Sequence, residues 1–419
     1  MSFMARGWSA VAALLLSLLI TRLLSQDAAG VYFTGMTVVA ALAIVLRCGL
    51  DQLIIRSAAN PDRVTRVFVG YAIAMLLLYV ILVLPLAYGV RAIWGAHIPS
   101  PLWMFVHCSP AVSIIWLSAG YAKARGHAPL ANFLEAGAVP TLLIVSLLSI
   151  TGVDLRSSAI AYAAVTVLVA VLAVVIIVLS LRGKPGAELP TAGDFREGSS
   201  IMTATLLDFC VIWCSGLALT MVSSMEAVAE YHVAQRLAIL ISFVLIVVNS
   251  ISAPVYARAF DRQDLPAVVD VYRYSSMLAL GVAVLPLAVY LLFPQFLLSL
   301  FGEVYRSAYL LLIILALGQL VNVATGSVGY LLMLSGNARY YRRASVIAAL
   351  FALFFTWPLL HFFDALGAAL ATSLGVSIKN ILAAFYVRRH VGVSLAFPPR
   401  ELSSLFSRRR MNEVFANRD

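Results

Sequence analysis

Ser25–Tyr32 reads Ser-Gln-Asp-Ala-Ala-Gly-Val-Tyr, and Ser224–Tyr231, 199 residues later, reads Ser-Met-Glu-Ala-Val-Ala-Glu-Tyr. Serine, an acid, alanine, a small residue and tyrosine follow in the same order. A second pair of similar stretches is Gly120–Ala128 and Gly329–Ala338, at an offset of 209 to 210 residues. Both pairs lie between long apolar runs. Two similar halves in an apolar chain are typical of transporters, so the sequence predicts an internal repeat.

The composition indicates an integral membrane protein. Hydrophobic residues make up 62% of the 419 residues, charged residues make up 11%, and the mean hydropathy is +0.97. A soluble domain has about 45–50% apolar and about 25% charged residues. The sequence therefore predicts an all-α integral membrane protein in which apolar runs form the transmembrane helices.

A transmembrane helix needs roughly 20 mostly apolar residues. The expected spans are 7–24, 31–50, 67–90, 102–121, 129–150, 158–181, 200–221, 229–256, 275–293, 307–334, 344–363 and 366–388. Twelve spans divide into two six-helix bundles that agree with the repeat. An even number of spans in each half gives both halves the same orientation, so the repeats are expected to be parallel. The predicted divisions are an N-terminal bundle (1–181), a cytoplasmic linker (182–199), a C-terminal bundle (200–388) and a basic cytoplasmic tail (389–419).

The lysines and arginines predict the orientation. When the connections alternate between the two sides, 23 of the 29 basic residues fall on one side and 4 on the other. The basic side is expected to be cytoplasmic, which puts both termini there. The net charge of +10 then comes from basic residues that set the topology next to anionic lipid. It predicts no nucleic-acid partner. The first span is expected to be a retained helix, because the segment after it belongs to the repeat.

Motifs for catalysis are not expected in this chain. It has no glycine-rich Lys-Ser/Thr phosphate loop, and its connections are too short for a soluble catalytic domain. Cys48, Cys108, Cys210 and Cys214 lie in or beside spans and are interpreted as small apolar residues, not metal ligands. The six histidines have no ligand spacing. The sequence predicts no enzyme activity, no cofactor and no metal.

Ionisable residues inside the spans are the candidate functional residues, because such groups are costly in lipid and normally face a cavity or a partner. The basic candidates are Arg22, Arg47, Arg236 and Lys379, and the acidic candidates are Glu135 and Asp208. The basic group outnumbers the acidic group, which favours an anionic ligand such as a phosphate.

Each candidate also has a structural interpretation. Arg22 could snorkel to the surface, and Arg47 could form an ion pair with Asp51. The two acids, Glu135 and Asp208, could hold helices together. The structural interpretation is weakest for the two deepest cations, Arg236 and Lys379.

Several segments together resemble a known family. They are Arg22-Leu23-Leu24 with Ala29-Gly30-Val31-Tyr32, Arg47–Asp51 with Arg56, Tyr231–Leu237, Leu300–Tyr305, and Gly329-Tyr330 through Asn337. In this order they resemble the Wzx-type oligosaccharide-lipid flippases, a polysaccharide transporter family. That family belongs to the multidrug/oligosaccharidyl-lipid/polysaccharide exporter superfamily, with the multidrug extrusion proteins and the murein lipid flippases. The likeness covers about residues 1–390.

The resemblance implies an alternating-access transporter of the bacterial inner membrane. Its substrate would be a polyprenyl-diphosphate-linked oligosaccharide, moved from the cytoplasmic to the outer leaflet for O-antigen, capsule or exopolysaccharide synthesis. Arg22, Arg47, Arg236 and Lys379 are expected to contact the anionic headgroup, and Glu135 or Asp208 to couple transport to protons or sodium. Polysaccharide polymerase and chain-length machinery are candidate partners besides the bilayer.

Three other functions remain open from the sequence. A drug or cation antiporter of the same superfamily would need an acidic or aromatic cavity, whereas the in-span residues here are mainly basic. A polysaccharide polymerase or ligase would need a substantial outer loop. A membrane scaffold would leave the basic residues within the spans without a role.

Overall fold

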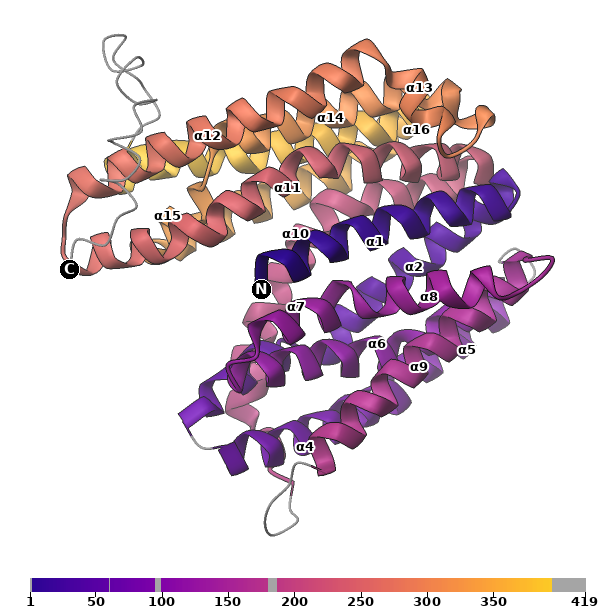
Figure 1. Cartoon of the computed structure of the whole chain (residues 1–419), viewed down its shortest axis with the longest axis horizontal. Coiled ribbons are helices and arrows are strands. Elements are labelled where there is room, and N and C mark those ends of the chain that lie inside the picture. Colours follow the sequence, from indigo (N-terminus) through magenta and orange to yellow (C-terminus); the bar gives the residue numbers. More distant parts are fainter. Residues whose placement is uncertain (1, 60, 95–98, 180–186, 394–419) are drawn as a thin grey trace. The chain divides into compact units, whose positions relative to one another are not determined.

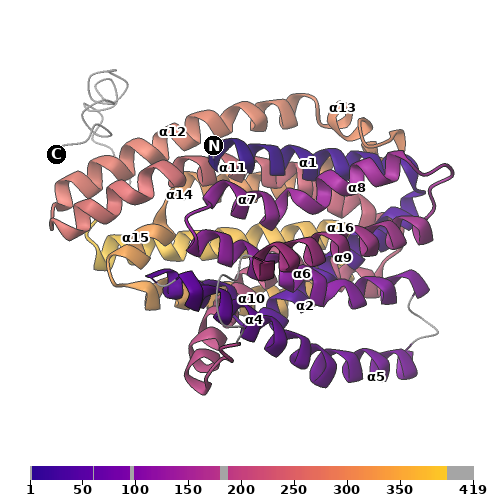
Figure 2. The same ribbon diagram turned by 60° about the horizontal axis from the view of Figure 1, so that its bottom comes forward.

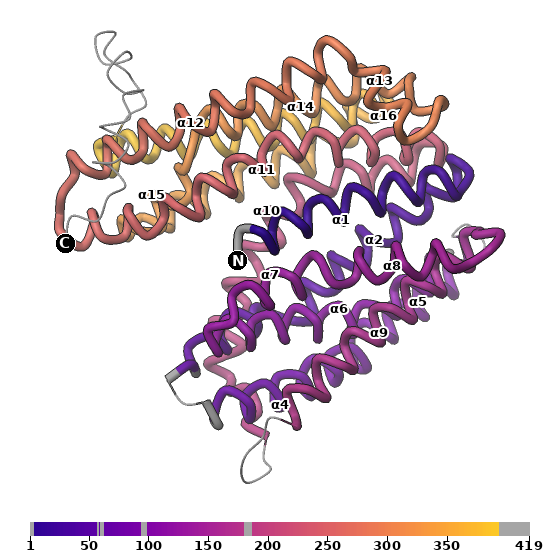
Figure 3. The backbone as a smooth tube through the Cα atoms, in the orientation of Figure 1, coloured from indigo at the N-terminus to yellow at the C-terminus, as the bar shows by residue number. Residues whose placement is uncertain are grey.

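The computed structural model describes residues 2–59, 61–94, 99–179 and 187–393, and every regular element in these ranges is a helix. The backbone coils throughout the described chain and contains no extended strand (Figure 3). Helices satisfy their own backbone hydrogen bonds, as hydrocarbon requires. The predicted all-α class is therefore confirmed. Residues 394–419 of the predicted tail and residues 182–186 of the predicted linker lie outside the described ranges.

The helices form two compact units. Unit 1 contains residues 1–209, 223–232 and 300–302, and unit 2 contains residues 210–222, 233–299 and 303–419. The helices of unit 1 are α1 (Ser2–Leu23), α2 (Gln26–Arg47), α3 (Leu50–Leu53), η1 (Ile54–Ala59), α4 (Pro61–Leu78), η2 (Tyr79–Val83), α5 (Leu84–Trp94), α6 (Ser100–Ala124), α7 (Ala128–Ala136), α8 (Ala138–Leu148) and α9 (Leu155–Leu179). The helices that contribute residues to both units are α10 (Ala192–Val222) and α11 (Met225–Asp261). The domain boundaries expected from the sequence stay a prediction.

The remaining elements follow α11 (Figure 1). They are α12 (Leu265–Leu292), α13 (Pro294–Ser299), η3 (Glu303–Ala308), α14 (Tyr309–Thr325), α15 (Val328–Leu334) and α16 (Ala338–His390). Within unit 2, α14 packs against both α12 and α16, and α15 packs against α16. Within unit 1, α6 packs against α2 and α9, and α1 packs against α7 and α8 (Figure 2).

Ten helices of the described chain are long and apolar enough to cross a membrane, or eleven if the bent pair α7–α8 is one span. That pair turns by 50° at Gly137. The 53 residues of α16 correspond to about 80 Å, more than twice a hydrocarbon core of about 30 Å. Its backbone is non-helical at Asp364, between the two last predicted spans. The number twelve stays a prediction: the expected spans fall on helical segments, but 129–150 and 307–334 are each interrupted, and the last two lie within α16.

The first repeated stretch is a helix N-cap. Ser25 Oγ accepts a hydrogen bond from the Ala28 N–H at the start of α2, and Ser224 Oγ accepts one from the Ala227 N–H at the start of α11. Both distances are 3.3 Å. A serine in this position satisfies a backbone donor that the first turn leaves open. The stretches are thus similar because each begins a helix in the same way.

The second repeated stretch is a helix C-cap. Gly126 after α6 and Gly336 after α15 have φ of 79° and 74°. The next residue closes the turn each time: the His127 N–H donates to the Ala122 carbonyl and the Asn337 N–H to the Leu332 carbonyl, both at 2.8 Å. This is the six-to-one hydrogen bond of a Schellman motif. The internal repeat is therefore visible in two pairs of matching caps.

α10 starts at Ala192, inside the segment expected to be a flexible linker. The Thr191 N–H donates to the Asp194 carboxylate, and the Asp194 N–H donates to Thr191 Oγ1, which is a reciprocal cap. Before it, Glu188 forms an ion pair with Arg63 of α4 at 2.8 Å. The cap extends the helix ahead of the apolar run, which is why hydropathy alone placed its start too late.

The glycine caps make a prediction about stability. Gly126→Ala and Gly336→Ala should each lower the free energy of unfolding by about 1 kcal/mol, because alanine is disfavoured at positive φ. An added Cβ meets nothing within 4 Å at either site, so strain is the only cost. Gly89→Ala on α5 is the control, since its Cβ also meets nothing and its φ is not positive. Thermal unfolding in detergent should show a lower unfolding temperature for Gly126→Ala and Gly336→Ala and a higher one for Gly89→Ala. An unchanged unfolding temperature of Gly126→Ala would contradict the Schellman motif.

Candidate functional site

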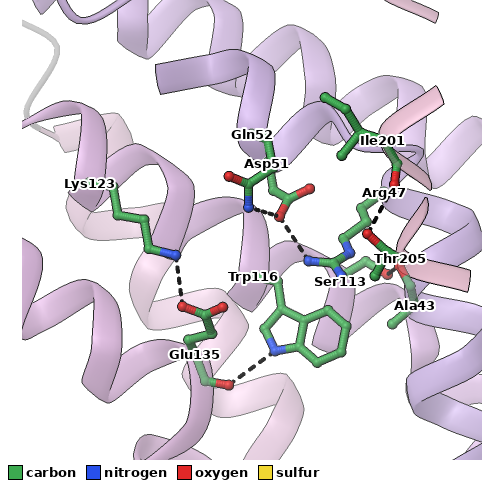
Figure 4. A network of polar contacts seen from close by, with 10 residues as sticks. All are labelled: Ala43, Arg47, Asp51, Gln52, Ser113, Trp116, Lys123, Glu135, Ile201 and Thr205. Carbon is green, nitrogen blue, oxygen red and sulfur yellow. Dashed lines mark hydrogen bonds and ion pairs between the residues drawn. The ribbon is translucent and has the colours of Figure 1, made fainter. Parts of the chain in front are cut away.

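Two candidate residues of unit 1, Arg47 and Glu135, belong to a connected polar network on α2, α3, α6 and α7 (Figure 4). Arg47 ends α2, where Cys48 and Gly49 both take positive φ and turn the chain into α3. This turn places Asp51 next to Arg47, and their side chains form an ion pair at 2.8 Å. The exposed fractions are 14% for the Arg47 side chain and 6% for that of Asp51. Arg47 therefore forms the ion pair with Asp51 that the structural interpretation of this residue expected.

Trp116 of α6 connects this ion pair to Glu135. The Arg47 guanidinium carbon lies 4.4 Å from the centre of the Trp116 ring, which is a cation–π contact. On its other side, Trp116 Nε1 donates to the backbone carbonyl of Glu135 at 3.1 Å. Glu135 also forms an ion pair with Lys123 at 2.8 Å (Figure 4). Arg47 and Glu135 were predicted from the sequence, whereas Lys123 and Trp116, which lie on one face of α6, were not.

Glu135 lies beside the break between α7 and α8. Its side chain is partly exposed and lines a cavity of about 170 Å³ inside unit 1 with Trp116 and Tyr162. A cavity of this size has room for several water molecules. Glu135 is thus an accessible carboxylate that forms an ion pair with Lys123. Asp208, the other acidic candidate, lies half-buried on α10.

Arg22, the remaining candidate of unit 1, lies at the end of α1. Its side chain is exposed, and its Nε donates to the Leu300 carbonyl at 2.8 Å. The contact fastens the end of α1 to residues 300–302, which belong to the same unit. Nearby, Gln26 of α2 donates to the Glu230 carboxylate of α11 at 3.2 Å, so the two repeated helix starts lie side by side.

Unit 2 holds the two deepest cations, Arg236 on α11 and Lys379 on α16. Lys379 is 9% exposed and Arg236 is half-buried. Lys379 is 15 residues beyond Asp364 and 11 before the end of α16, or about 22 Å and 16 Å along the helix. Neither end of the helix is within easy reach of a lysine side chain. Next to Arg236, Gln235 donates to the Ile212 carbonyl at 2.5 Å.

Lys379 lies level with a break in the neighbouring helix. Gly318 of α14 packs directly on Ser373 of α16, and further along, α15 shares its core with Ala383 and Val387. α14–α15 and this half of α16 therefore run in parallel. Lys379, about 9 Å beyond Ser373, is at the level of the last turn of α14.

The break itself depends on Gly326. Its φ is 69°, and an added Cβ would lie 2.0 Å from Ser276 Oγ, so conformation and space both require glycine. The last carbonyls of α14 keep partners: Tyr272 OH donates to the Thr325 carbonyl at 2.8 Å, and Thr325 Oγ1 donates to that of Asn322 at 2.9 Å. Ser276 Oγ is buried and has no hydrogen-bond partner among the described residues.

Neutral polar side chains surround the break. Ser242 of α11 donates to Gln319, and Asn322 donates to Ser242 at 3.0 Å. Ser327, just past the break, donates to Asn249 of α11. The polar residues Asn249, Gln319 and Asn322 inside apolar helices can be read from the sequence. The helix break at Gly326, beside which they lie, could not be predicted from it. A deep lysine, a discontinuous helix and these amides could hold an anionic group and hydroxyls at one level of unit 2.

No protein-family model matches the sequence. None of the curated proteins matches it either. Solved structures do share its fold. The lipid II flippase MurJ in an inward closed conformation superposes with a TM-score of 0.68 over 96% of this chain and 89% of MurJ, at 14% identity. A MATE transporter in a bent conformation gives a TM-score of 0.62 over 93% of both chains, at 16% identity.

A third match is a MOP superfamily transporter from Pyrococcus furiosus, for which a reverse polarity of the binding pocket suggests a different function. Its TM-score is 0.56 over 93% of this chain and 95% of that one, at 14% identity. The chain therefore has the fold of the MATE transporters and MurJ, which confirms the predicted fold class at the level of the architecture.

The Arg47–Asp51 pair makes a second prediction. Arg47→Gln should lower the free energy of unfolding by about 3 kcal/mol, because it leaves the Asp51 carboxylate buried without its counter-charge. The double variant Arg47→Gln/Asp51→Asn should recover most of this loss, since no buried charge then remains. Thermal unfolding of the three proteins in detergent measures both effects. A double variant as unstable as Arg47→Gln would contradict the ion pair as the cause.

Proposed function

We propose that this chain is a flippase of the bacterial inner membrane that moves a polyprenyl-diphosphate-linked oligosaccharide to the outer leaflet. The observation that carries the proposal is Lys379, a buried cation in the middle of an apolar helix, level with the Gly326 break. The Lys379 ammonium can donate charge-assisted hydrogen bonds to the oxygens of a diphosphate, and the amide and hydroxyl cluster beside the break suits sugar hydroxyls.

The fold supports transport by alternating access. MurJ is a flippase that acts on lipid II, and the MATE proteins are multidrug resistance transporters. Sugars and diphosphate cannot cross hydrocarbon unaided, so a protein must shield them while the lipid tail stays in the bilayer. An inside-negative potential also favours outward movement of an anion, by about 2.3 kcal/mol per charge per 100 mV. Synthesis of O-antigen, capsule or exopolysaccharide would consume the lipid-linked oligosaccharide that reaches the outer leaflet.

Arg22, Arg47 and Arg236 are proposed to join Lys379 in contacting the diphosphate or acidic sugars. They differ in the strength of their support. Arg47 has an Asp51 partner and Arg22 holds the Leu300 carbonyl, so each already has a structural role. Arg236 and Lys379 lie inside long apolar helices of unit 2, where the cost of the charge is highest.

Replacement of Lys379 tests the proposal. Lys379→Ala should lower transfer of the lipid-linked oligosaccharide in proteoliposomes by at least about tenfold, as expected for loss of a charged hydrogen bond. Lys379→Arg should keep part of the activity because it keeps the charge. Arg388→Ala, an exposed basic residue at the end of the same helix, is the control and should transport normally. Full transfer by Lys379→Ala at normal protein level would contradict the assignment.

The energy source is a separate proposal. Glu135 lines a cavity with room for water and has Lys123 as a counter-ion, so a proton or sodium ion could exchange with the lysine there. Glu135→Gln or Asp208→Asn should remove the response of transport to an imposed proton or sodium gradient. Proteoliposomes with and without each gradient provide the measurement. An unchanged response in both variants would exclude these carboxylates as coupling residues.

A drug or cation antiporter is the alternative function, because the MATE proteins share the fold. Its cationic substrates would need accessible carboxylates, whereas Asp51 and Glu135 form ion pairs. Unchanged drug sensitivity of a deletion strain, together with accumulation of lipid-linked oligosaccharide, is the expected outcome. The opposite pattern would favour the antiporter.

A further inference from the structure

Unit 1 contains a second and larger cavity, separate from the Arg47 network. Its volume is about 450 Å³, and residues of α6, α7, α8 and α9 form its walls. Most of the lining is aliphatic, and no carboxylate contributes to it. Rim residues such as Leu130, Leu172 and Ile176 are 49%, 49% and 67% exposed. The cavity is therefore a groove that opens on the surface of the chain between membrane-spanning helices.

One end of the groove is basic. Arg125 and His127 line it where α6 ends and α7 begins, and both side chains are exposed. The Gly126 turn fixes this end, because the His127 N–H bonds back to the Ala122 carbonyl at 2.8 Å. Arg125 has no ion-pair partner among the described residues. The C-terminal turns of α9, with Ile176 and Ile177, reach the same end of the groove.

The shape and charge of the groove identify the class of its ligand. A long aliphatic wall takes an apolar chain, and a basic end takes an anionic head. Within a bilayer the chain gains little by leaving other chains, so the headgroup must provide the selectivity. The basic end is on the side expected to be cytoplasmic, where anionic lipids are concentrated and where basic pockets between helices bind their headgroups.

We propose that this groove is a binding site for an anionic phospholipid of the surrounding bilayer. One acyl chain lies along α8 and α9, and the phosphate lies between Arg125 and His127. The groove has no acidic side chain to repel that phosphate, and a zwitterionic lipid would gain less from the two basic residues. The site is independent of the proposed transport substrate, since its residues belong to neither the Arg47 network nor the Gly326 break.

Competition between lipids tests the proposal. The full chain in detergent is mixed with phosphatidylglycerol and phosphatidylcholine of identical acyl chains. Native mass spectrometry then gives the ratio of the two lipids that stay bound to the protein. The wild type should prefer phosphatidylglycerol. Arg125→Gln/His127→Gln should lower that preference by roughly fivefold or more, as expected for loss of basic contacts at a membrane surface. Arg156→Gln, at the opposite end of α9 and also exposed, should leave it unchanged.

A second pair of variants tests the position of the chain. Leu172→Trp fills the groove and should lower retention of phosphatidylglycerol, whereas Val171→Trp, an equally exposed neighbour outside the lining, should not. An unchanged lipid preference in Arg125→Gln/His127→Gln, or an equal loss in Arg156→Gln, would overturn the proposal. Displacement of phosphatidylglycerol by undecaprenyl phosphate at equal concentration would also overturn it, and would assign the groove to an isoprenoid chain.

Discussion

The cost of an unpaired polar group in hydrocarbon is the constraint on which the rest of this structure depends. Water is absent from the bilayer core, so each backbone N–H and carbonyl must find its partner within the protein. Long helices meet this requirement without help, as do the ten to eleven apolar spans in the part of the chain that the structure describes. Each interruption of a helix then needs local compensation. At Gly326 the compensation comes from Tyr272 and Thr325, and at Gly126 and Gly336 it comes from the backbone of the next residue.

The same constraint explains why the repeat is so faint in the sequence. Lipid-facing positions accept almost any apolar residue, so most of each half is free to diverge. Cap positions are not free, because serine must accept at a helix start and glycine must adopt positive φ at a helix end. The two halves nevertheless differ at the level of Gly326. Leu117, which corresponds to Gly326 by the repeat offset, lies inside the continuous helix α6, so only the second half has the break.

Much of the fold could be predicted from the sequence, and less of the site. Apolar run lengths located the helices, because the hydropathy of a segment largely decides whether it crosses a membrane. They could not place helix ends that a polar cap extends, as at Ala192. Deep cations such as Lys379 were visible because they interrupt an apolar run. The partners of Arg47 and Glu135 were harder to find. Asp51 lies one turn away and could be guessed, whereas Trp116 and Lys123 depend on how α6 packs against α2 and α7.

The in-span charges of unit 1 and unit 2 lie in different surroundings. In unit 1, Arg47 and Glu135 have ion-pair partners and an aromatic ring between them, so the network is complete without a ligand. In unit 2, Lys379 lies level with a helix break lined by neutral amides and hydroxyls. An anionic headgroup at that level could bind the ammonium while its hydroxyls bind the amides, which is why the proposed substrate site lies in unit 2.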